Sequence, residues 1–269
     1  MKHHLSADQI ESYRRDGFLL VEGCLDPAEL EVWRRCTDEA VAERIGGPVA
    51  LDNGVWLSNH GDPDSYYSQV FTQCLKLAET HAGMRELMFD PRLGEMAGRL
   101  AGVDGIRIWH DQALIKPPFG NPTGWHMDNP FWSFTSRDAI SIWVALDDAT
   151  LGNGCLWYLP GTHLDGKTGA VSLGPNQADL FKIYPEWRAV EPVACPCPAG
   201  SALFHSGIVA HGAGANMTNR QRRAMTCAYM PDGSTFNGVR NILPSEYFES
   251  LKVGDVLDDD AVNPLIWRA

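Results

Sequence analysis

The chain is short of basic residues, with 22 Lys and Arg against 34 Asp and Glu and a formal net charge of -12. Nucleic-acid binding needs basic stripes that neutralise phosphates, and because none occurs we expect no nucleic-acid partner. We interpret the acidic excess as a solvated surface. Apolar runs of about 18 residues and a signal peptide are also missing, so we expect no membrane partner and a cytoplasmic setting.

The cysteines do not make a disulfide framework, because the seven of them are odd in number and scattered along the chain. Such a pattern is typical of a reducing compartment. Cys195 and Cys197 form the one close pair, and without a second pair to complete a four-ligand zinc site we interpret them as structural. Internal repeats and low-complexity segments are absent too. With 44% apolar residues, the chain is predicted to be one domain over residues 1–269.

About the first 104 residues are predicted to be mainly helical, because helix caps and glycine stops punctuate them. From residue 105 to about 232 the pattern changes to short β-type runs separated by turns, and residues 233–269 are expected to form a tail with an acidic surface stretch at 255–264. The expected segments are a helix from Ser6 to Gly17, a strand at 18–21, helices at 27–44, 66–82 and 90–101, and strands at 106–116, 124–128, 139–146, 155–159, 201–205 and 222–230. This order predicts a mainly β fold with flanking helices and a sandwich or jelly-roll barrel.

Three His-x-Asp triplets occur in the chain, whereas composition alone gives roughly 0.7. The triplet by itself therefore proves nothing, and its surroundings must decide. Two of the three lie among turn residues and are interpreted as loops. The triplets are His60/Asp62, His126/Asp128 and His163/Asp165.

His126 and Asp128 lie in a predicted strand, where residues i and i+2 project to the same side and can reach one ion. A third ligand is needed, and His211 is our candidate because small residues follow it and an arginine pair comes later. His205, six residues earlier, is the competitor. Two imidazoles and one carboxylate on one face are the arrangement of non-haem iron(II) oxygenases.

Several segments, in this order, closely resemble the phytanoyl-CoA dioxygenase family of iron(II)- and 2-oxoglutarate-dependent oxygenases. They are LIKPP, TGWHMDNPFW, ISIWVALDDATLGNGCLWYLPGTH and LFHSGIVAHGAGANMTNRQRRA. The likeness covers about residues 5–229 and is strongest over 106–230. It implies a double-stranded β-helix core, which is a cupin-like jelly roll. It also implies iron(II) held by His126, Asp128 and His211, with 2-oxoglutarate and O2 as cosubstrates.

The resemblance makes Arg222, eleven residues after His211, the partner of the distal carboxylate of 2-oxoglutarate. A guanidinium fork suits this task, because it donates two parallel charge-assisted hydrogen bonds. If Arg222 points into the barrel, strand alternation turns Thr226 inward and Arg223 outward. Many relatives carry a serine where this chain has Ala213, so Arg222 acts alone or with another hydroxyl, such as that of Thr226.

Three further residues are candidates for the cosubstrate pocket. Thr123 and Trp143 match positions that line this pocket in related oxygenases, and Gln112 is a candidate donor to the carboxylate nearest the metal. Trp143 is equally interpretable as core, and Gln112 as a strand residue whose hydrogen bonds are satisfied. Asp128 favours hydroxylation, because related halogenases replace this carboxylate with glycine or alanine.

For the substrate we expect a small metabolite or natural-product intermediate rather than an acyl-CoA, because no basic patch awaits the CoA phosphates. An aromatic-walled pocket and a lid near Trp56, Asn59, Tyr66 and Tyr67 are hypotheses. Desaturation, epoxidation or ring closure fits the same cofactors, and two other readings are a non-catalytic cupin-like binding protein and a cupin metalloenzyme that needs no 2-oxoglutarate. The candidate substrate-binding residues are Trp109, Asn129, Phe131, Trp132 and Phe134.

Overall fold

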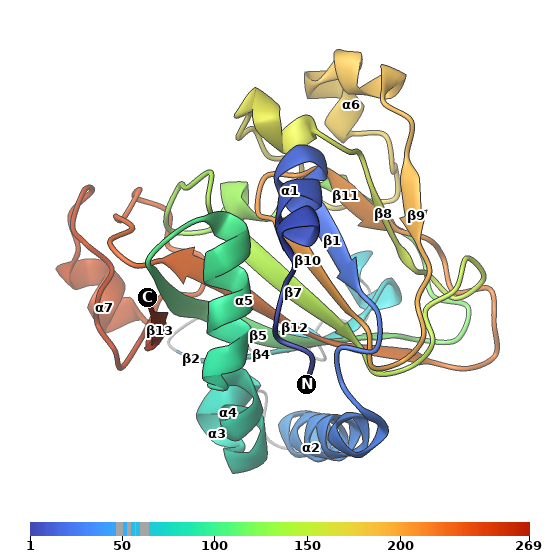
Figure 1. The fold of residues 1–269 in the computed structure, drawn as a ribbon, viewed down its shortest axis with the longest axis horizontal. Helices are drawn as coiled ribbons and strands as arrows, with labels where there is room; N and C mark the ends of the chain where they lie inside the picture. The colour runs from blue at the N-terminus through green and yellow to red at the C-terminus, as the bar shows by residue number, and fades with distance from the viewer. Residues whose placement is uncertain (47–50, 53–54, 57, 60–64) are drawn as a thin grey trace.

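Two antiparallel sheets with helices outside them form the framework of the chain (Figure 1). The computed structural model describes residues 1–46, 51–52, 55–56, 58–59 and 65–269. The larger sheet has the order β1 (Phe18–Val21), β10 (Ala202–Ser206), β7 (Ile140–Ala145), β12 (Arg222–Pro231), β5 (Gly105–Lys116) and β13 (Leu265–Arg268), and β4 (Thr72–Leu75) also pairs with β5. The smaller sheet has the order β6 (Thr123–His126), β11 (His211–Ala213), β8 (Leu156–Tyr158) and β9 (Val193–Cys195).

Strand β7 shows how the layers are built. Its residues are buried on both faces. Ile142 belongs to the apolar cluster shared with the helices, whereas Trp143 belongs to the cluster shared with the smaller sheet. Because successive side chains of a strand alternate, one face of the larger sheet packs under helices and the other faces the smaller sheet. The predicted strands therefore assemble into the two facing sheets of a jelly roll.

The N-terminal helices cover the outer face of the larger sheet (Figure 1). Ser6 begins the first helix with a capping box shared with Gln9, and Gly17 ends it with a left-handed φ of 86°. Both ends are as the sequence predicts. These helices are α1 (Ala7–Asp16), α2 (Pro27–Gly46), α3 (Leu77–Thr80), α4 (Ala82–Met88) and α5 (Pro91–Ala101). None of the helices in the described ranges has the length and apolar content to span a bilayer.

The helix predicted over residues 66–82 is wrong. Strand β4 lies inside this range and pairs with β5, and the four-residue helix α3 follows it. Asp111 of β5 accepts hydrogen bonds from the backbone N–H groups of Leu77 and Ala78 at the start of α3. Pairing of β4 with β5 thus outweighs the local helix propensity of this segment. Such a contact with a distant strand cannot be seen in the sequence of the segment itself.

The C-terminal segment is docked on the larger sheet, although most of its acidic stretch is exposed as its composition predicts. Leu257 and Asn263 are buried, and β13 pairs with the start of β5. Arg107 of β5 binds Asp232 and Asp260 at 2.6 Å each, so part of the acidic charge serves to hold the segment on the sheet. The remaining short elements are β2 (Leu51–Asp52), β3 (Val55–Trp56), α6 (Leu180–Ile183), α7 (Ser245–Ser250), η2 (Tyr67–Gln69), η3 (Asn129–Phe131), η4 (Thr162–Asp165) and η5 (Pro185–Ala189).

Gly98 of α5 tests how tightly the C-terminal strand is docked. A Cβ atom at Gly98 would meet the indole ring of Trp267. We expect Gly98→Ala to lower the free energy of unfolding by about 1–3 kcal/mol, the usual cost of overpacking, as measured by urea denaturation. Gly46→Ala is the control, because nothing lies within 4 Å of a Cβ there. Equal stability of the two variants would contradict this packing.

Candidate active site

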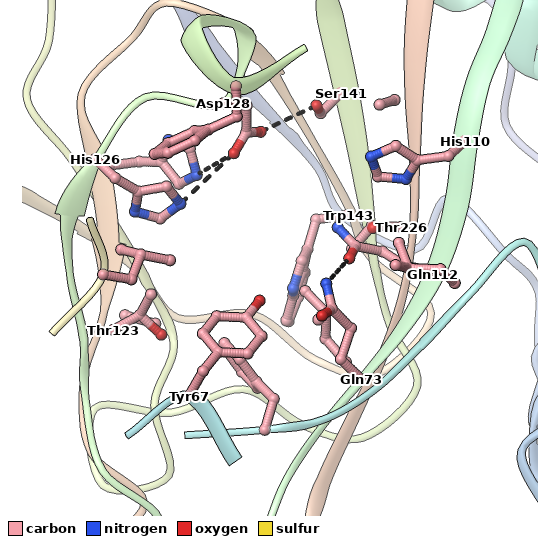
Figure 2. A pocket seen from close by; sticks show the side chains of 18 of the residues that line it. Tyr67, Gln73, His110, Gln112, Thr123, His126, Asp128, Ser141, Trp143 and Thr226 are labelled. Carbon is pink, nitrogen blue, oxygen red and sulfur yellow. Dashed lines mark hydrogen bonds and ion pairs between the residues drawn. The ribbon is translucent and has the colours of Figure 1, made fainter. Parts of the chain in front are cut away.

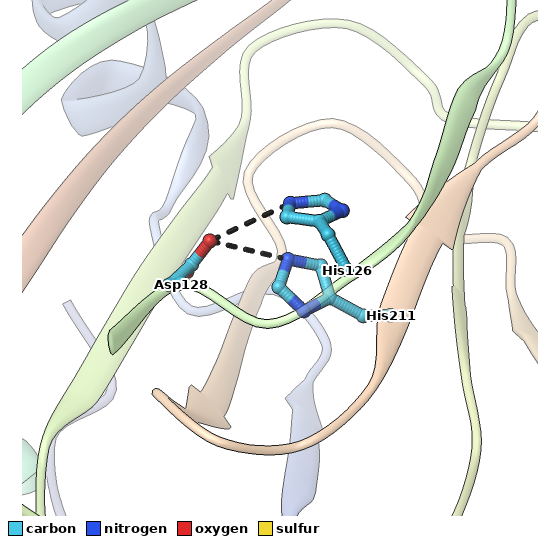
Figure 3. A group of neighbouring side chains, drawn as sticks. All are labelled: His126, Asp128 and His211. Atoms are coloured by element: carbon cyan, nitrogen blue, oxygen red, sulfur yellow. Dashed lines mark ion pairs between the residues drawn. The ribbon is translucent and has the colours of Figure 1, made fainter. Parts of the chain in front are cut away.

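Two histidines and one aspartate meet between the sheets (Figure 3). His126 ends β6, His211 begins β11, and the two residues are direct partners in the ladder between these strands. Asp128 follows His126 by two residues, and one donor atom from each of the three side chains lies within 4.8 Å of the others. The antiparallel ladder thus brings two distant parts of the sequence to one ion-sized site.

Hydrogen bonds to the backbone orient both imidazoles. His126 Nδ1 lies 2.9 Å from the carbonyl oxygen of Gly124, and His211 Nδ1 lies 3.1 Å from that of Val209. Because a carbonyl oxygen only accepts, each Nδ1 carries the proton and donates it. Each Nε2 is then left with its lone pair toward Asp128 Oδ1, at 3.5 Å from His126 and 3.6 Å from His211. This is the tautomer that a metal ligand requires.

Asp128 reaches the site from a turn. Strand β6 ends at His126, and Asp128 has helical backbone angles just before η3. Its backbone N–H donates to the carbonyl oxygen of Gly207. The explanation from strand alternation is therefore wrong for this residue, although the two side chains do meet. Met127 between them is buried in an apolar cluster, as expected for a packing residue.

The outer oxygen of Asp128 is held by the larger sheet. Asp128 Oδ2 lies 3.2 Å from Ser141 Oγ of β7 and 3.2 Å from His205 Nε2 of β10. The Nδ1 atom of His205 in turn lies 3.1 Å from the hydroxyl of Tyr158. Burial opposes ionisation of Asp128, yet the surrounding imidazoles, led by His211, outweigh it and hold the pKa of its carboxyl well below the usual range. His205 thus supports a ligand and does not belong to the cluster itself.

Removing one of these supports should weaken metal binding. Partners that orient metal ligands typically contribute 10–100-fold in affinity, and we expect Ser141→Ala to raise the iron(II) dissociation constant by about tenfold. Competition with a chromogenic chelator measures this constant. Ser201→Ala, which removes another buried serine hydroxyl, should leave it unchanged. An unaltered constant in Ser141→Ala would show that Asp128 needs no such support.

A cavity of about 510 Å³ opens beside the cluster (Figure 2). His126, Asp128 and His211 line one side of it, and side chains of β5, β7 and β12 line the other. The Tyr67 hydroxyl points into it from η2, before β4. A pocket of this size between two sheets is large enough for a cosubstrate and a small molecule.

Arg222 is fully buried at the start of β12. Its guanidinium carbon lies 5.0 Å from the ring centroid of Trp143 and 5.9 Å from that of Phe71, and both rings line the cavity. Nη2 donates to the carbonyl oxygen of Gly154, whereas Nε and Nη1 have no hydrogen-bond partner in the described part of the chain. Because buried donors are rarely left unsatisfied, these two nitrogens indicate a missing acceptor. Arg223 points the other way, to Asp147 and Asp38.

Lys116 adds a second buried cation. It is the direct partner of Arg222 in the ladder between β5 and β12, and its Nζ donates to the carbonyl oxygen of Asn121. Burial and the charge of Arg222 lower the pKa of Lys116 to about 7, and burial lowers the pKa of Arg222 to about 10. An anion placed between the sheets would relieve both effects. The motif LIKPP contains this lysine, but its spacing alone does not predict a role for it.

Two hydroxyls are candidates to replace the serine missing at Ala213. Thr123 and Thr226 both line the cavity. Thr123 is the direct partner of Ala213 in the ladder between β6 and β11, and its buried Oγ1 has no hydrogen-bond partner among the described residues. Thr226 lies on the opposite sheet, between Trp143 and Gln112. Thr123 is therefore the nearer substitute for the absent serine.

Gln112 is paired with a residue that the sequence did not single out. Its Oε1 accepts a hydrogen bond of 2.5 Å from Gln73 Nε2 of β4, and both side chains line the cavity (Figure 2). Because the acceptor end of Gln112 is occupied, its amide N–H groups are available to the cavity. This orientation suits the predicted role of a donor.

Of the five predicted substrate-binding residues, Phe131 and Trp132 line the cavity and three do not. Asn129 is buried, donates to the carbonyl oxygen of Phe134 and accepts from the backbone of Ser136, so it shapes the turn after Asp128. Trp109 and Phe134 pack edge to face in the same apolar cluster as Trp132, but neither of them lines the cavity. The prediction is wrong for these three, because a cluster of rings fills a core as readily as it lines a pocket.

The other predicted candidates have simpler places. His163 lies in η4 with its Nε2 near the carbonyl oxygen of Arg14, and Asp165 accepts from the Trp187 indole. His60 and Asp62, like the Trp56 side chain, lie outside the described residues. Of the proposed lid, Tyr67 lines the cavity, whereas Asn59 and Tyr66 bind backbone groups of Phe71, Gln73 and Pro122.

A jelly roll that holds two histidines and one carboxylate between its sheets defines the class of non-haem iron oxygenases. The family model described as phytanoyl-CoA dioxygenase (PhyH) matches residues 13–224, and the chain belongs to this family. It is an iron(II)- and 2-oxoglutarate-dependent dioxygenase. The phytanoyl-CoA dioxygenase of Arabidopsis thaliana is 30% identical over 82% of this chain and 87% of its own length. The methylphosphonate hydroxylase of Gimesia maris is 27% identical over 85% and 82%.

Solved structures confirm the predicted double-stranded β-helix. The carbocyclase SnoK from nogalamycin biosynthesis, described as non-haem and α-ketoglutarate-dependent, superposes with a TM-score of 0.78 at 25% identity, over 97% of this chain and 96% of SnoK. The epimerase SnoN, in complex with Fe3+, α-ketoglutarate and nogalamycin RO, gives a TM-score of 0.71 at 26% identity, over 96% and 97%. These relatives share one fold and carry out different reactions.

Proposed function

We propose that this enzyme hydroxylates a C–H bond of a small molecule at iron(II) held by His126, Asp128 and His211. The observation that supports this is the buried cluster of three donors, with both Nε2 lone pairs and Asp128 Oδ1 facing one point. Such a donor set fits iron(II) and leaves open positions for other ligands. When bound, iron(II) with 2-oxoglutarate and O2 supplies the oxidising chemistry and yields succinate and CO2.

The cosubstrate would be held by the polar groups beside the cluster. Arg222 would bind the distal carboxylate through Nε and Nη1, which lack partners, with the charge of Lys116 beside it. Thr123 would donate its free hydroxyl in place of the missing serine. Gln112 would donate to the carboxylate nearest the metal, and Trp143 would pack against the cosubstrate chain. These groups are already oriented, so little ordering is needed on binding.

Anaerobic addition of iron(II) and then 2-oxoglutarate tests this proposal. We expect the weak visible charge-transfer absorption of an iron-bound keto acid to develop only when both are present. On admission of air, succinate should accumulate. Absence of the absorption at saturating cosubstrate would overturn the proposed site, and Zn(II) in place of iron(II) is the control that binds without absorbing.

Hydroxylation is the first candidate for the reaction, but the comparison with SnoK favours testing a second reaction type as well. That protein is described as a carbocyclase, so ring closure is the alternative for this chain, along with desaturation and epoxidation. Mass spectrometry of the product separates hydroxylation, which adds one oxygen, from ring closure and desaturation, which remove two hydrogens. Epoxidation of an alkene also adds one oxygen, and NMR of the product distinguishes it from hydroxylation. Loss of two hydrogens without gain of oxygen would replace hydroxylation by one of the others.

A further inference from the structure

His110 and Asn241 border the cavity and have no part in the proposed metal or cosubstrate site. His110 lies on β5, and its ring points into the cavity on the wall opposite His126 (Figure 2). Asn241 comes from the C-terminal segment that follows β12 and lines the same cavity. Neither position carries a sequence signal of its own, because both depend on how distant segments pack.

Both residues present buried polar atoms without partners. His110 Nδ1 and Asn241 Oδ1 have no hydrogen bond within the described structure. A buried polar group left unsatisfied costs about 1–3 kcal/mol, so native proteins keep few of them. Asn241 also has a left-handed φ of 44°, a conformation that non-glycine residues adopt rarely and that clusters at functional sites. A ligand atom that completes these hydrogen bonds would account for both.

The surroundings of the pair are apolar. Ala228, the direct partner of His110 across the ladder, lies in one apolar cluster with Trp132 and Ile242, the neighbour of Asn241. All three also line the cavity. His110 and Asn241 thus border the same apolar wall of the cavity.

Charge is scarce at this end of the cavity. Among the described residues that line it there is no Lys or Arg, and Asp128 is the one carboxylate. The sequence from 47 to 64, which includes residues outside the described ranges, also contains neither Lys nor Arg. Burial lowers the pKa of His110 to about 4, so its imidazole is neutral at pH 7. An ionised group brought here would lose its hydration without contacting a Lys or Arg of the cavity lining.

We propose that His110 and Asn241 position the substrate by hydrogen-bonding an oxygen of an uncharged, largely apolar, ring-sized molecule. This inference rests on the proposed function, because it places the substrate at the end of the cavity that the cosubstrate would not fill. Neutral imidazole offers one donor and one acceptor, and the Asn241 amide offers both as well. A hydroxyl group on the substrate satisfies this pair, because it can donate to Asn241 Oδ1 and accept from the Nδ1–H tautomer of His110. A phosphonate, carboxylate or ammonium group would bring a charge that the apolar wall does not balance.

Binding of matched probes to the Zn(II)-loaded protein with 2-oxoglutarate tests this inference without turnover. The probes are naphthol, naphthoate, naphthylmethylammonium and methylphosphonate, followed by saturation-transfer NMR. Naphthol should bind at least about tenfold more tightly than each charged probe. His110→Phe and Asn241→Gly, of which the second keeps the unusual φ, should each weaken naphthol binding by about tenfold. The exposed His4→Phe is the control for the histidine change.

Charged probes that bind as tightly as naphthol, naphthol that fails to bind, or variants that bind naphthol like the wild type would each overturn the inference. Binding of 2-oxoglutarate is followed in the same samples. If the wild type does not bind the cosubstrate, the proposed function fails, while the preference among probes is still read from the cavity. If the cosubstrate binds and the preference is absent, only the assignment of His110 and Asn241 fails.

Discussion

Asp128→Asn is expected to lower both iron(II) affinity and succinate formation by more than about 100-fold, the upper end of what the partners of metal ligands contribute. The substitution keeps the shape of the side chain but removes the negative charge that faces the two Nε2 atoms. The outer atom of the side chain, at the position of Asp128 Oδ2, stays next to Ser141 and His205. Chelator competition and succinate detection measure the two quantities.

The matched control for this change is Asp138→Asn, at an exposed carboxylate. It should leave iron affinity, succinate formation and thermal stability at wild-type values. Far-UV circular dichroism verifies that both variants are folded. Wild-type iron affinity in folded Asp128→Asn would show that the cluster is not the metal site, and would remove the basis of the proposed mechanism.

Arg222→Ala should raise the dissociation constant for 2-oxoglutarate by more than about 100-fold, because it removes two charge-assisted hydrogen bonds of about 1.5–3 kcal/mol each. Arg222→Lys restores the charge but not the fork, and its constant should lie between those of Arg222→Ala and the wild type. Titration of the charge-transfer absorption under anaerobic conditions gives each constant. Iron(II) affinity in the absence of 2-oxoglutarate should not change.

Arg223→Ala is the control on the same strand. It loses the ion pairs with Asp147 and Asp38 on the outer face, so stability falls somewhat while cosubstrate affinity stays. If Arg222→Ala and Arg223→Ala bind 2-oxoglutarate equally well, the distal carboxylate lies elsewhere. Unchanged turnover in Arg222→Ala would show that Arg222 does not hold the cosubstrate.

The sequence predicts those features that short segments carry by themselves. Strands β5 and β7 are rich in isoleucine and other residues that favour strands, and the sequence of α1 includes both of its caps. The pairing of His126 with His211 follows from motif order and resemblance. The resemblance implies the role of Arg222, and strand alternation then predicts that Arg223 faces outward.

What could not be predicted depends on contacts between distant segments. Strand β4 exists because β5 offers it an edge, and the C-terminal segment is ordered because β13 pairs with β5. His205 is a candidate ligand by its sequence position, yet on the larger sheet its Nε2 contacts the outer oxygen of Asp128 and supports that residue instead. Ring side chains near a ligand look alike in sequence, and only the packing shows that Trp132 lines the cavity whereas Phe134, in the same apolar cluster, does not.

The return of the C-terminal segment to β5 has a consequence for how this enzyme can diversify. Asn241 and Ile242 arrive at the cavity after the last strand of the jelly roll, whereas the proposed metal ligands come before it. Insertions or exchanges between β12 and β13 would therefore change the residues that line the substrate end of the cavity, while the positions of the proposed iron ligands stay the same. Grafting this segment from one relative to another offers a route to new selectivity that leaves the reactive centre in place.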